Sequence, residues 1–209
     1  MGFGSRCFCC CYCTIYMLMF MVMIASIIFW IIISPSSVKF HITDASLTRF
    51  NLTSDHNLYY NFRVNITVRN PNDNIIVYYR RITAIAWYKD NDFAFFSITP
   101  FDQGHKNTTF LGPVVFEGQS VMKLGSKQLA EYAEESRMGI YTDLAVDLDL
   151  RIRAKYGRFK SSRFNPPVVQ CRRLRVPLII SNGKSPPSFN VTKCRTGYFF
   201  ADRDADAGA

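Results

Sequence analysis

Histidine is scarce in this chain, and the usual catalytic arrangements are absent. His41, His56 and His105 are the only side chains that ordinarily titrate near neutral pH. None of the three stands in a nucleophile elbow, an HExxH motif or a paired-carboxylate setting. No glycine-rich phosphate loop follows a strand-like segment. We therefore expect a protein that is not an enzyme and that holds no cofactor, nucleotide or metal.

Charge is absent from residues 14–33. These twenty residues include no charged side chain, and as a helix they would reach ~30 Å, about the thickness of the hydrocarbon core of a bilayer. A cleaved signal peptide is the alternative, but its apolar stretch is usually only about 7 to 15 residues long. The run predicts a transmembrane helix over 14–33, preceded by a head at 1–13 and followed by a domain at 34–181 and a tail at 182–209.

Cysteine is rare after this run and crowded before it. Five of the seven cysteines lie in the head: Cys7, Cys9, Cys10, Cys11 and Cys13. Thiols beside a membrane helix are typical substrates of S-palmitoylation, with a metal site and unmodified thiols as alternatives. Cys171 and Cys194 stand alone in the rest of the chain, where we predict that they form a disulfide. Two buried free thiols are the alternative.

The orientation of the predicted span follows from potential glycosylation sites. Basic residues near the run decide little, because Arg6 on one side is balanced by Lys39 and Arg49 on the other. Four N-x-T sequons all follow the run, at Asn51, Asn65, Asn107 and Asn190. Such acceptors are glycosylated in secreted segments. We therefore predict a cytosolic head and an extracellular C-terminal domain.

The domain after the run has the apolar periodicity of β-strands. Alternation is strictest from Leu144 to Tyr156 and clear from Leu58 to Arg69. Further strand-like segments lie at 38–42, 75–79, 82–88, 93–98, 114–116, 121–124 and 168–180. Patterning with one buried face predicts an all-β domain, an antiparallel β-sandwich. Within the strictest strand, Leu148 is expected to face the core and Asp147 the solvent.

One segment has helical rather than strand periodicity. Leu129, Tyr132 and Ala133 recur at the spacing of a helix face. Ser126 is a candidate N-cap, and Gly139 follows the last helical residue. The sequence therefore predicts one short helix between the strands.

Acidic residues are missing between Asp149 and Asp202, where twelve basic residues lie. If the strands of this region are neighbours, a cationic face forms from Arg151, Arg153, Lys155, Arg172, Arg173 and Arg175. Anionic lipid headgroups, an acidic wall polysaccharide or a membrane protein are candidate partners, and the attraction would depend on salt. A solvated face that only keeps the domain soluble is the alternative. The predicted compartment argues against nucleic acid, which charge alone would favour.

Several short motifs together point to a known family. They are Asn70-Pro71-Asn72, then Tyr78-Tyr79, then a loop with Gln103-Gly104-His105-Lys106-Asn107, and finally Cys171 and Lys193-Cys194. With its cysteine-rich head and single span, the chain resembles the plant harpin-induced / non-race-specific disease resistance-like proteins. Their ectodomain is the late-embryogenesis-abundant type 2 (water stress and hypersensitive response) domain.

The resemblance implies a fold, a location and a role. It implies a fibronectin III-like β-sandwich, residence at the plasma membrane, and a part in pathogen defence or abiotic-stress responses. Two positions depart from the family pattern: Arg80 stands where an acidic residue often follows the tyrosines, and Asp102 replaces an aromatic residue. We expect a non-enzymatic, membrane-anchored protein of plant defence signalling or of adhesion between plasma membrane and cell wall. A stress-protective domain that shields membrane or wall is the alternative.

Overall fold

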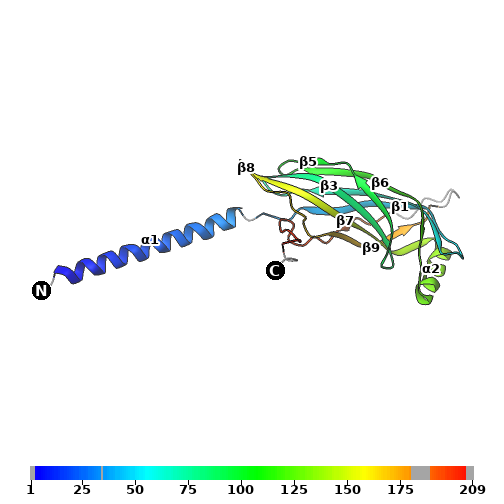
Figure 1. Cartoon of the computed structure of the whole chain (residues 1–209), viewed down its shortest axis with the longest axis horizontal. Helices are drawn as coiled ribbons and strands as arrows, with labels where there is room; N and C mark the ends of the chain where they lie inside the picture. Colours follow the sequence, from blue (N-terminus) through cyan, green and yellow to red (C-terminus); the bar gives the residue numbers. More distant parts are fainter. Residues whose placement is uncertain (1–2, 34, 180–188, 206–209) are drawn as a thin grey trace. The chain divides into compact units, whose positions relative to one another are not determined.

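The computed structural model describes residues 3–33, 35–179 and 189–205, and within the first helix it describes the side chains of residues 12–28 (Figure 1). The chain divides into two compact units, Met1–Ser36 and Ser37–Ala209. The first unit is the helix α1, Phe3–Ile33. Nearly all of its described apolar side chains are solvent-exposed, Ile15, Met17 and Leu18 among them. Among the described residues, no helix has both the length and the apolarity needed to cross a membrane.

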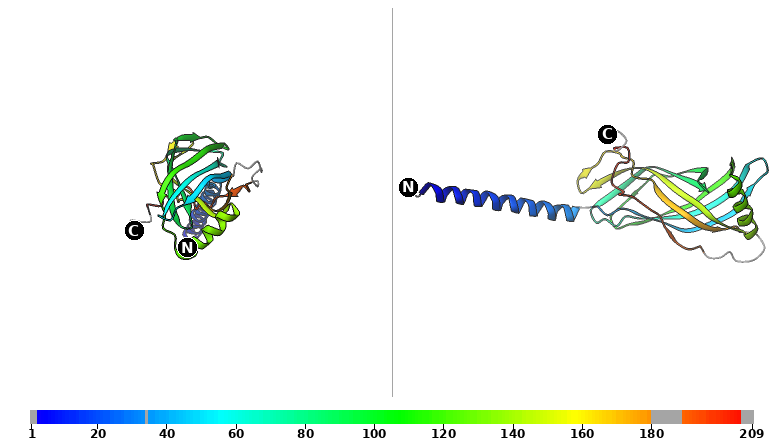
Figure 2. Two further views of the ribbon diagram at one scale, coloured as in Figure 1. Left: turned by 90° about the vertical axis from the view of Figure 1, so that its right-hand side faces the viewer. Right: turned by 90° about the horizontal axis from the view of Figure 1, so that it is seen from below.

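The second unit consists of two antiparallel sheets and a short helix (Figures 1 and 2). One sheet has the order β10-β1-β2-β6, with bounds Thr192–Lys193, Lys39–Leu52, Asn57–Arg69 and Thr108–Val121. The other has β4-β3-β7-β8, with bounds Asn91–Ile98, Ile75–Tyr88, Ile140–Tyr156 and Phe159–Lys160; β5 (Phe101–Gln103) pairs with β3, and β9 (Val169–Pro177) pairs with β7. The predicted antiparallel β-sandwich is confirmed, whereas its likeness to fibronectin III stays a prediction.

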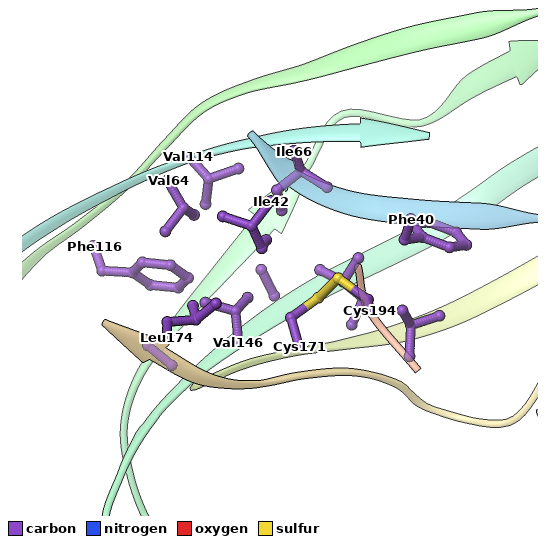
Figure 3. Close-up of a cluster of buried hydrophobic side chains, with 14 of the residues drawn as sticks. Phe40, Ile42, Val64, Ile66, Val114, Phe116, Val146, Cys171, Leu174 and Cys194 are labelled. Carbon is purple, nitrogen blue, oxygen red and sulfur yellow. A yellow bond between two sulfur atoms is a disulfide. The ribbon is translucent and has the colours of Figure 1, made fainter. Parts of the chain in front are cut away.

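The core lies between the two sheets, because alternate residues of each strand point inward. Phe40, Ile42 and Val64 of the first sheet meet Val146 and Leu174 of the second (Figure 3). Each side chain of this size contributes roughly 1.5 to 3 kcal/mol when it is fully buried. Leu148 is also fully buried, so its predicted inward orientation is confirmed.

Several strands run further than their apolar patterns indicate, and β1 and β3 show why. β1 continues to Leu52, although alternation is clear only to Ile42, because bulges next to Asp44 and Arg49 shift which residues face inward. β3 is a single strand through the residue pair that separates its two predicted halves, with a register shift between Tyr79 and Arg81. A bulge adds one residue to a strand and therefore breaks the period of two.

The predicted short helix is α2, Ser126–Met138, and its caps are glycines. Gly125, rather than Ser126, is the N-cap, and its backbone N–H donates to the side chain of Gln128 at 3.0 Å. Gly139 ends the helix in the left-handed region, with φ of 69°. The buried face carries Tyr132 and Glu135, whereas Leu129 is exposed.

Part of the predicted tail packs on the sandwich. Residues 182–188 lie outside the described part of the chain, but β10 at Thr192–Lys193 pairs with β1 and thereby extends the first sheet. Phe199 is 1% exposed and packs against Phe40, with ring centroids 5.7 Å apart. This segment has too few residues in sequence to show a strand period, so its contribution to the core depends on long-range pairing.

Candidate functional site

The Asn70-Pro71-Asn72 motif forms a buried polar network at one end of the sandwich. The side-chain amide of Asn70 donates to the carbonyl oxygens of Ile75, at 2.7 Å, and Gly104, at 2.9 Å. Its Oδ1 accepts from the backbone N–H and the side chain of Asn72, at 3.1 and 3.0 Å. Asn70 is fully buried. One side chain therefore satisfies a turn and a loop that lie more than thirty residues apart.

Gln103 holds the other side of this network. Its Nε2 donates to the carbonyl oxygen of Val68 at 2.8 Å and also lies within hydrogen-bond distance of Asn107 O and Thr109 Oγ1, while its Oε1 accepts from the Tyr79 hydroxyl at 3.2 Å. Burial raises the pKa of Tyr79 well above its usual range, so the phenol remains a donor. These bonds fix the loop that carries the second half of the family motif.

The remaining motif residues lie on the surface around this network. His105, Lys106 and Asn107 are exposed, and Lys106 pairs with Asp73 at 2.7 Å. Tyr78 lies under the guanidinium of Arg80, 5.0 Å from the ring centroid. The motif is therefore chiefly structural, because its buried members shape the loop.

The two departures from the family pattern contact each other. Arg80 Nη2 lies 3.3 Å from Asp102 Oδ1, across the pairing of β3 with β5. Both side chains are about half exposed, so the pair contributes at most ~1 kcal/mol to stability. Two positions that look unrelated in sequence are one ion pair in the structure.

The predicted cationic face is split into two parts. β7 and β9 are neighbours, as the prediction requires. Arg151, Arg153 and Lys155 lie on the half of β7 that pairs with the start of β3, and Asp149 in the same row is paired with Arg81 and Arg203. The other three predicted residues, Arg172, Arg173 and Arg175, lie on β9.

The β9 residues line a groove, here called the basic groove. Its larger part has a volume of about 490 Å³ and is lined by four cations, Arg172, Arg173, Lys193 and Arg195, together with Trp87, Ala145, Gln170 and the acids Asp90 and Asp143. An adjoining part of about 390 Å³ shares Arg173 and adds Arg175, with Phe189 and Asn190 on its wall. Together the two parts of the groove are lined by five exposed cations, with Trp87 in the larger part and Phe189 in the other.

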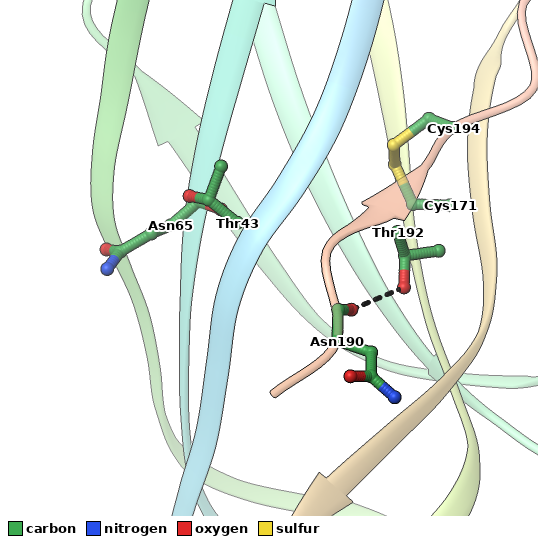
Figure 4. Close-up of a disulfide and its surroundings, with 6 residues drawn as sticks. All are labelled: Thr43, Asn65, Cys171, Asn190, Thr192 and Cys194. Carbon is green, nitrogen blue, oxygen red and sulfur yellow. Dashed lines mark hydrogen bonds between the residues drawn. A yellow bond between two sulfur atoms is a disulfide. The ribbon is translucent and has the colours of Figure 1, made fainter. Parts of the chain in front are cut away.

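Lys193 and Arg195 reach the groove because residues 192–195 bond to both sheets. Lys193 pairs with His41 of β1, while the backbone of Arg195 exchanges two hydrogen bonds with Gln170 of β9, at 2.9 and 2.7 Å. A disulfide joins Cys171 to Cys194, with Cα atoms 4.3 Å apart (Figure 4). Both cations are among the twelve basic residues of the acid-free stretch, although the six residues named for the predicted cationic face do not include them.

Asp147 is buried under the groove, so the prediction that it faces solvent is wrong. It points to the outer face of β7 but is only 4% exposed, because Arg172 of the next strand lies over it. Arg172 Nη2 lies 2.7 Å from Asp147 Oδ2, and its guanidinium carbon lies 5.5 Å from the ring centroid of Trp87. Burial raises the pKa of Asp147, and the charge of Arg172 partly opposes this increase.

The predicted modification sites differ in accessibility. Asn51, Asn107 and Asn190 are exposed, and the Thr192 hydroxyl of the last sequon donates to the Asn190 carbonyl oxygen at 3.1 Å (Figure 4). Asn65 lies on the outer face, as predicted, but is half-buried, and its Oδ1 is enclosed without a hydrogen-bond partner. A glycan there would have less room than at the other three sequons.

The head cysteines are described only in part. Cys13 is an exposed free thiol. The side chains of the other four, Cys7, Cys9, Cys10 and Cys11, lie outside the described residues. Among the described residues, no three His, Cys, Asp or Glu side chains lie close enough to share a metal ion.

Comparison with known proteins identifies the family. Residues 65–170 match the family model LEA_2, Late embryogenesis abundant protein. NDR1/HIN1-like protein 10 of Arabidopsis thaliana is 42% identical over 192 residues, which cover 90% of this chain and 83% of that protein. NDR1/HIN1-like protein 3 of the same plant is 42% identical over 172 residues, covering 82% and 72%. The predicted family is therefore confirmed: the chain belongs to the NDR1/HIN1-like proteins with a LEA_2 domain.

Proposed function

We propose that this protein is a non-enzymatic, plasma-membrane-anchored component of plant defence that adheres to acidic cell-wall polysaccharide through the basic groove. Membership of the NDR1/HIN1-like family is consistent with a defence- or stress-related role. The observation that carries the adhesive part is the groove itself, because its two parts, which share Arg173, are lined by five cations and each contain one aromatic side chain. Carboxylates of a polyuronate complement the cations, and sugar rings pack on aromatic faces.

Anchoring is proposed from the uncharged run over residues 14–33, part of which lies outside the described side chains. Nearly all described apolar side chains of α1 are exposed, and lipid would cover them. We further propose acylation of the head cysteines in the cytosol and glycosylation of the domain outside the cell. The exposed thiol of Cys13 and the exposed sequons at Asn51, Asn107 and Asn190 support this orientation.

Topology and acylation have direct tests. Protein expressed in plant cells should lose apparent mass on endoglycosidase treatment, and protease added to intact protoplasts should cleave the domain. Unchanged mass together with full protease resistance would reverse the proposed orientation. Acyl-exchange labelling should be lost when the five head cysteines are replaced by serine, and labelling that persists would contradict acylation there.

Groove binding is tested with polygalacturonate and a pair of matched variants. Arg173→Gln/Lys193→Gln removes two groove cations that take part in no ion pair among the described residues. Arg63→Gln/Lys123→Gln removes the same charge from exposed positions elsewhere on the domain. Wild type and the control should bind de-esterified polygalacturonate in a salt-dependent manner, whereas the groove variant should bind about tenfold or more weakly. Equal losses in both variants would show that only net charge matters and would contradict a groove site.

A stress-protective role is the second candidate. The family model that matches the chain carries the description Late embryogenesis abundant protein, which supports a role in shielding membrane or wall. The two candidates differ in partner specificity, because adhesion needs saturable binding at one site and physical shielding does not. Proximity labelling at the plasma membrane with and without a pathogen elicitor separates them: an elicitor-dependent protein neighbour would favour defence signalling.

A further inference from the structure

The β7–β8 hairpin carries an exposed phenylalanine between two cations. Phe159 is 82% exposed, more than any other large apolar side chain described in the sandwich unit. Gly157, with φ of 56°, makes the turn that pairs Tyr156 with Phe159. Arg158 and Lys160 flank Phe159, and neither belongs to an ion pair among the described residues. An apolar side chain between long basic side chains is typical of segments that enter the interface of a bilayer.

The hairpin lies at the end of the sandwich where the chain enters this unit, here called the entry pole. Figures 1 and 2 show the yellow hairpin and the start of β1 at the same end of the two sheets. The Gly157 N–H donates to the Asn74 carbonyl oxygen at 3.4 Å, and Lys39, the first residue of β1, pairs with Arg69 close to the same turn. The hairpin therefore belongs to a fixed surface rather than to a separate projection.

Exposed cations outnumber acids at this pole. The exposed basic residues there are Lys39, Arg69, Lys106, Arg158 and Lys160. Two exposed acids lie at the same pole: Asp73 pairs with Lys106, and Asp204, which follows the Phe200 ring packed on Tyr156, pairs with Arg203. A surface with this excess of positive charge is attracted to anionic lipid, and the attraction extends over about one Debye length, roughly 8 to 10 Å in physiological salt.

The connection to α1 is short. The helix ends at Ile33, and the Ser37 hydroxyl is already bonded to Gly197 O and Phe199 N of the sandwich unit, at 3.3 Å each. Residues 34–36 alone connect them, and an extended chain of that length spans at most about 15 Å. In a chain anchored through α1, the entry pole therefore remains close to the bilayer surface.

We propose that the β7–β8 hairpin is a second membrane contact, in which Phe159 enters the headgroup region and Arg158 and Lys160 bind anionic lipid headgroups. This inference rests on the anchoring proposed above. It assigns the hairpin a different ligand from the basic groove, which lies on β9 and β10. A contact at the pole would restrict the tilt of the domain and leave the groove open to the wall.

The test uses the full chain in lipid nanodiscs with acyl-brominated lipids, which quench tryptophan fluorescence at short range. The chain has two tryptophans, Trp30 and Trp87. In a Trp30→Phe background, Trp87 alone reports from the groove, and adding Phe159→Trp places a second probe on the hairpin. We expect discs that contain brominated phosphatidylserine to quench the fluorescence of the tryptophan introduced at position 159. Discs of brominated phosphatidylcholine alone should quench it little. If the fluorescence of this tryptophan is equal in brominated and unbrominated anionic discs, the proposal is overturned.

Charge variants test the mechanism of this contact. Arg158→Gln/Lys160→Gln should reduce the fraction of hairpins bound to the anionic bilayer about tenfold or more. High salt should also reduce this fraction. Lys123→Gln/Lys127→Gln, at exposed positions near and on α2, removes the same charge and should leave quenching unchanged. Equal effects of both pairs would contradict a contact specific to the hairpin.

Co-elution of the chain with the discs tests anchoring separately. A chain that co-elutes without hairpin quenching would overturn the hairpin contact alone. A chain that fails to co-elute would overturn anchoring and the hairpin contact with it.

Discussion

Arg172 Nη2 lies 2.7 Å from Asp147 Oδ2 on the neighbouring strand, above a carboxylate that is only 4% exposed. The arginine itself is more than one-third exposed, so it shields the acid from solvent while its own charge stays hydrated. Asp147 Oδ1 is enclosed without a hydrogen-bond partner. The burial of this acid is therefore compensated mainly by one partner, and the wall of the basic groove depends on that partner.

Removal of the partner should destabilise the domain. Arg172→Gln leaves the Asp147 carboxylate buried without its counterion, which in fully buried pairs costs about 3 to 5 kcal/mol. Because Arg172 is partly exposed, we expect about 2 kcal/mol in the free energy of unfolding by urea. Arg173→Gln on the same strand is the control and should cost under about 0.5 kcal/mol. Adding Asp147→Asn to Arg172→Gln should restore part of the loss, and a purely additive double variant would contradict the coupling.

The same acid predicts a pH dependence of stability. Burial raises the pKa of Asp147 in the folded state, so the folded state binds a proton more tightly than the unfolded chain does. Its contribution to stability is therefore greatest below the ordinary carboxyl pKa of about 3.9 and declines as pH rises through the raised folded value. Across that window, the unfolding free energy of Asp147→Asn should increase relative to wild type. A difference that does not change with pH would contradict the raised pKa.

The buried network around Asn70 should be more important for stability than the exposed ion pair beside it. Asn70→Ala removes two donors and one acceptor from buried and part-buried partners, and each unsatisfied buried group costs about 1 to 3 kcal/mol. We expect a loss of at least about 2 kcal/mol and faster amide exchange at residues 104–107. Lys106→Gln, which breaks the exposed pair with Asp73, should cost under about 1 kcal/mol. Equal costs would show that the network is not structural.

Replacement of the disulfide should weaken the domain and open the groove. Cys171→Ala/Cys194→Ala frees a loop of 23 residues in sequence separation, which costs about 3 kcal/mol on the chain-entropy model. Because Lys193 adjoins Cys194, polygalacturonate binding should decrease along with stability. Non-reducing mass spectrometry of the wild-type protein checks the bond directly: two alkylatable thiols before reduction, in addition to those of the head, would contradict it.

The strand pattern could be predicted from the sequence because burial of one face of a strand places an apolar residue at every second position. Leu148 shows this directly, since its inward orientation follows from its neighbours alone. Asp147 shows the limit, because alternation predicts the face on which a residue lies and not what covers that face. Its cover is Arg172, which is brought over it by pairing between β7 and β9.

The candidate site was less accessible to sequence reasoning than the fold. Arg172, Arg173 and Arg175 could be selected from the absence of acids around them. Lys193 and Arg195 lie in the same acid-free stretch, but their place beside β9 depends on backbone bonds and a disulfide to distant residues. The family motif could be recognised, but its burial at Asn70 and Gln103 makes it a structural element rather than a ligand site.

The segment at residues 192–195 also determines how the domain would carry mechanical load. Its pairing with β1 joins it to the strand through which the chain enters the sandwich, and its disulfide joins it to β9 in the opposite sheet. A pull between a wall polymer in the groove and an anchor before β1 would first stretch the short β1–β10 pairing. The covalent bond passes that tension into the second sheet, so the two layers would resist it together and the groove would hold its shape under tension.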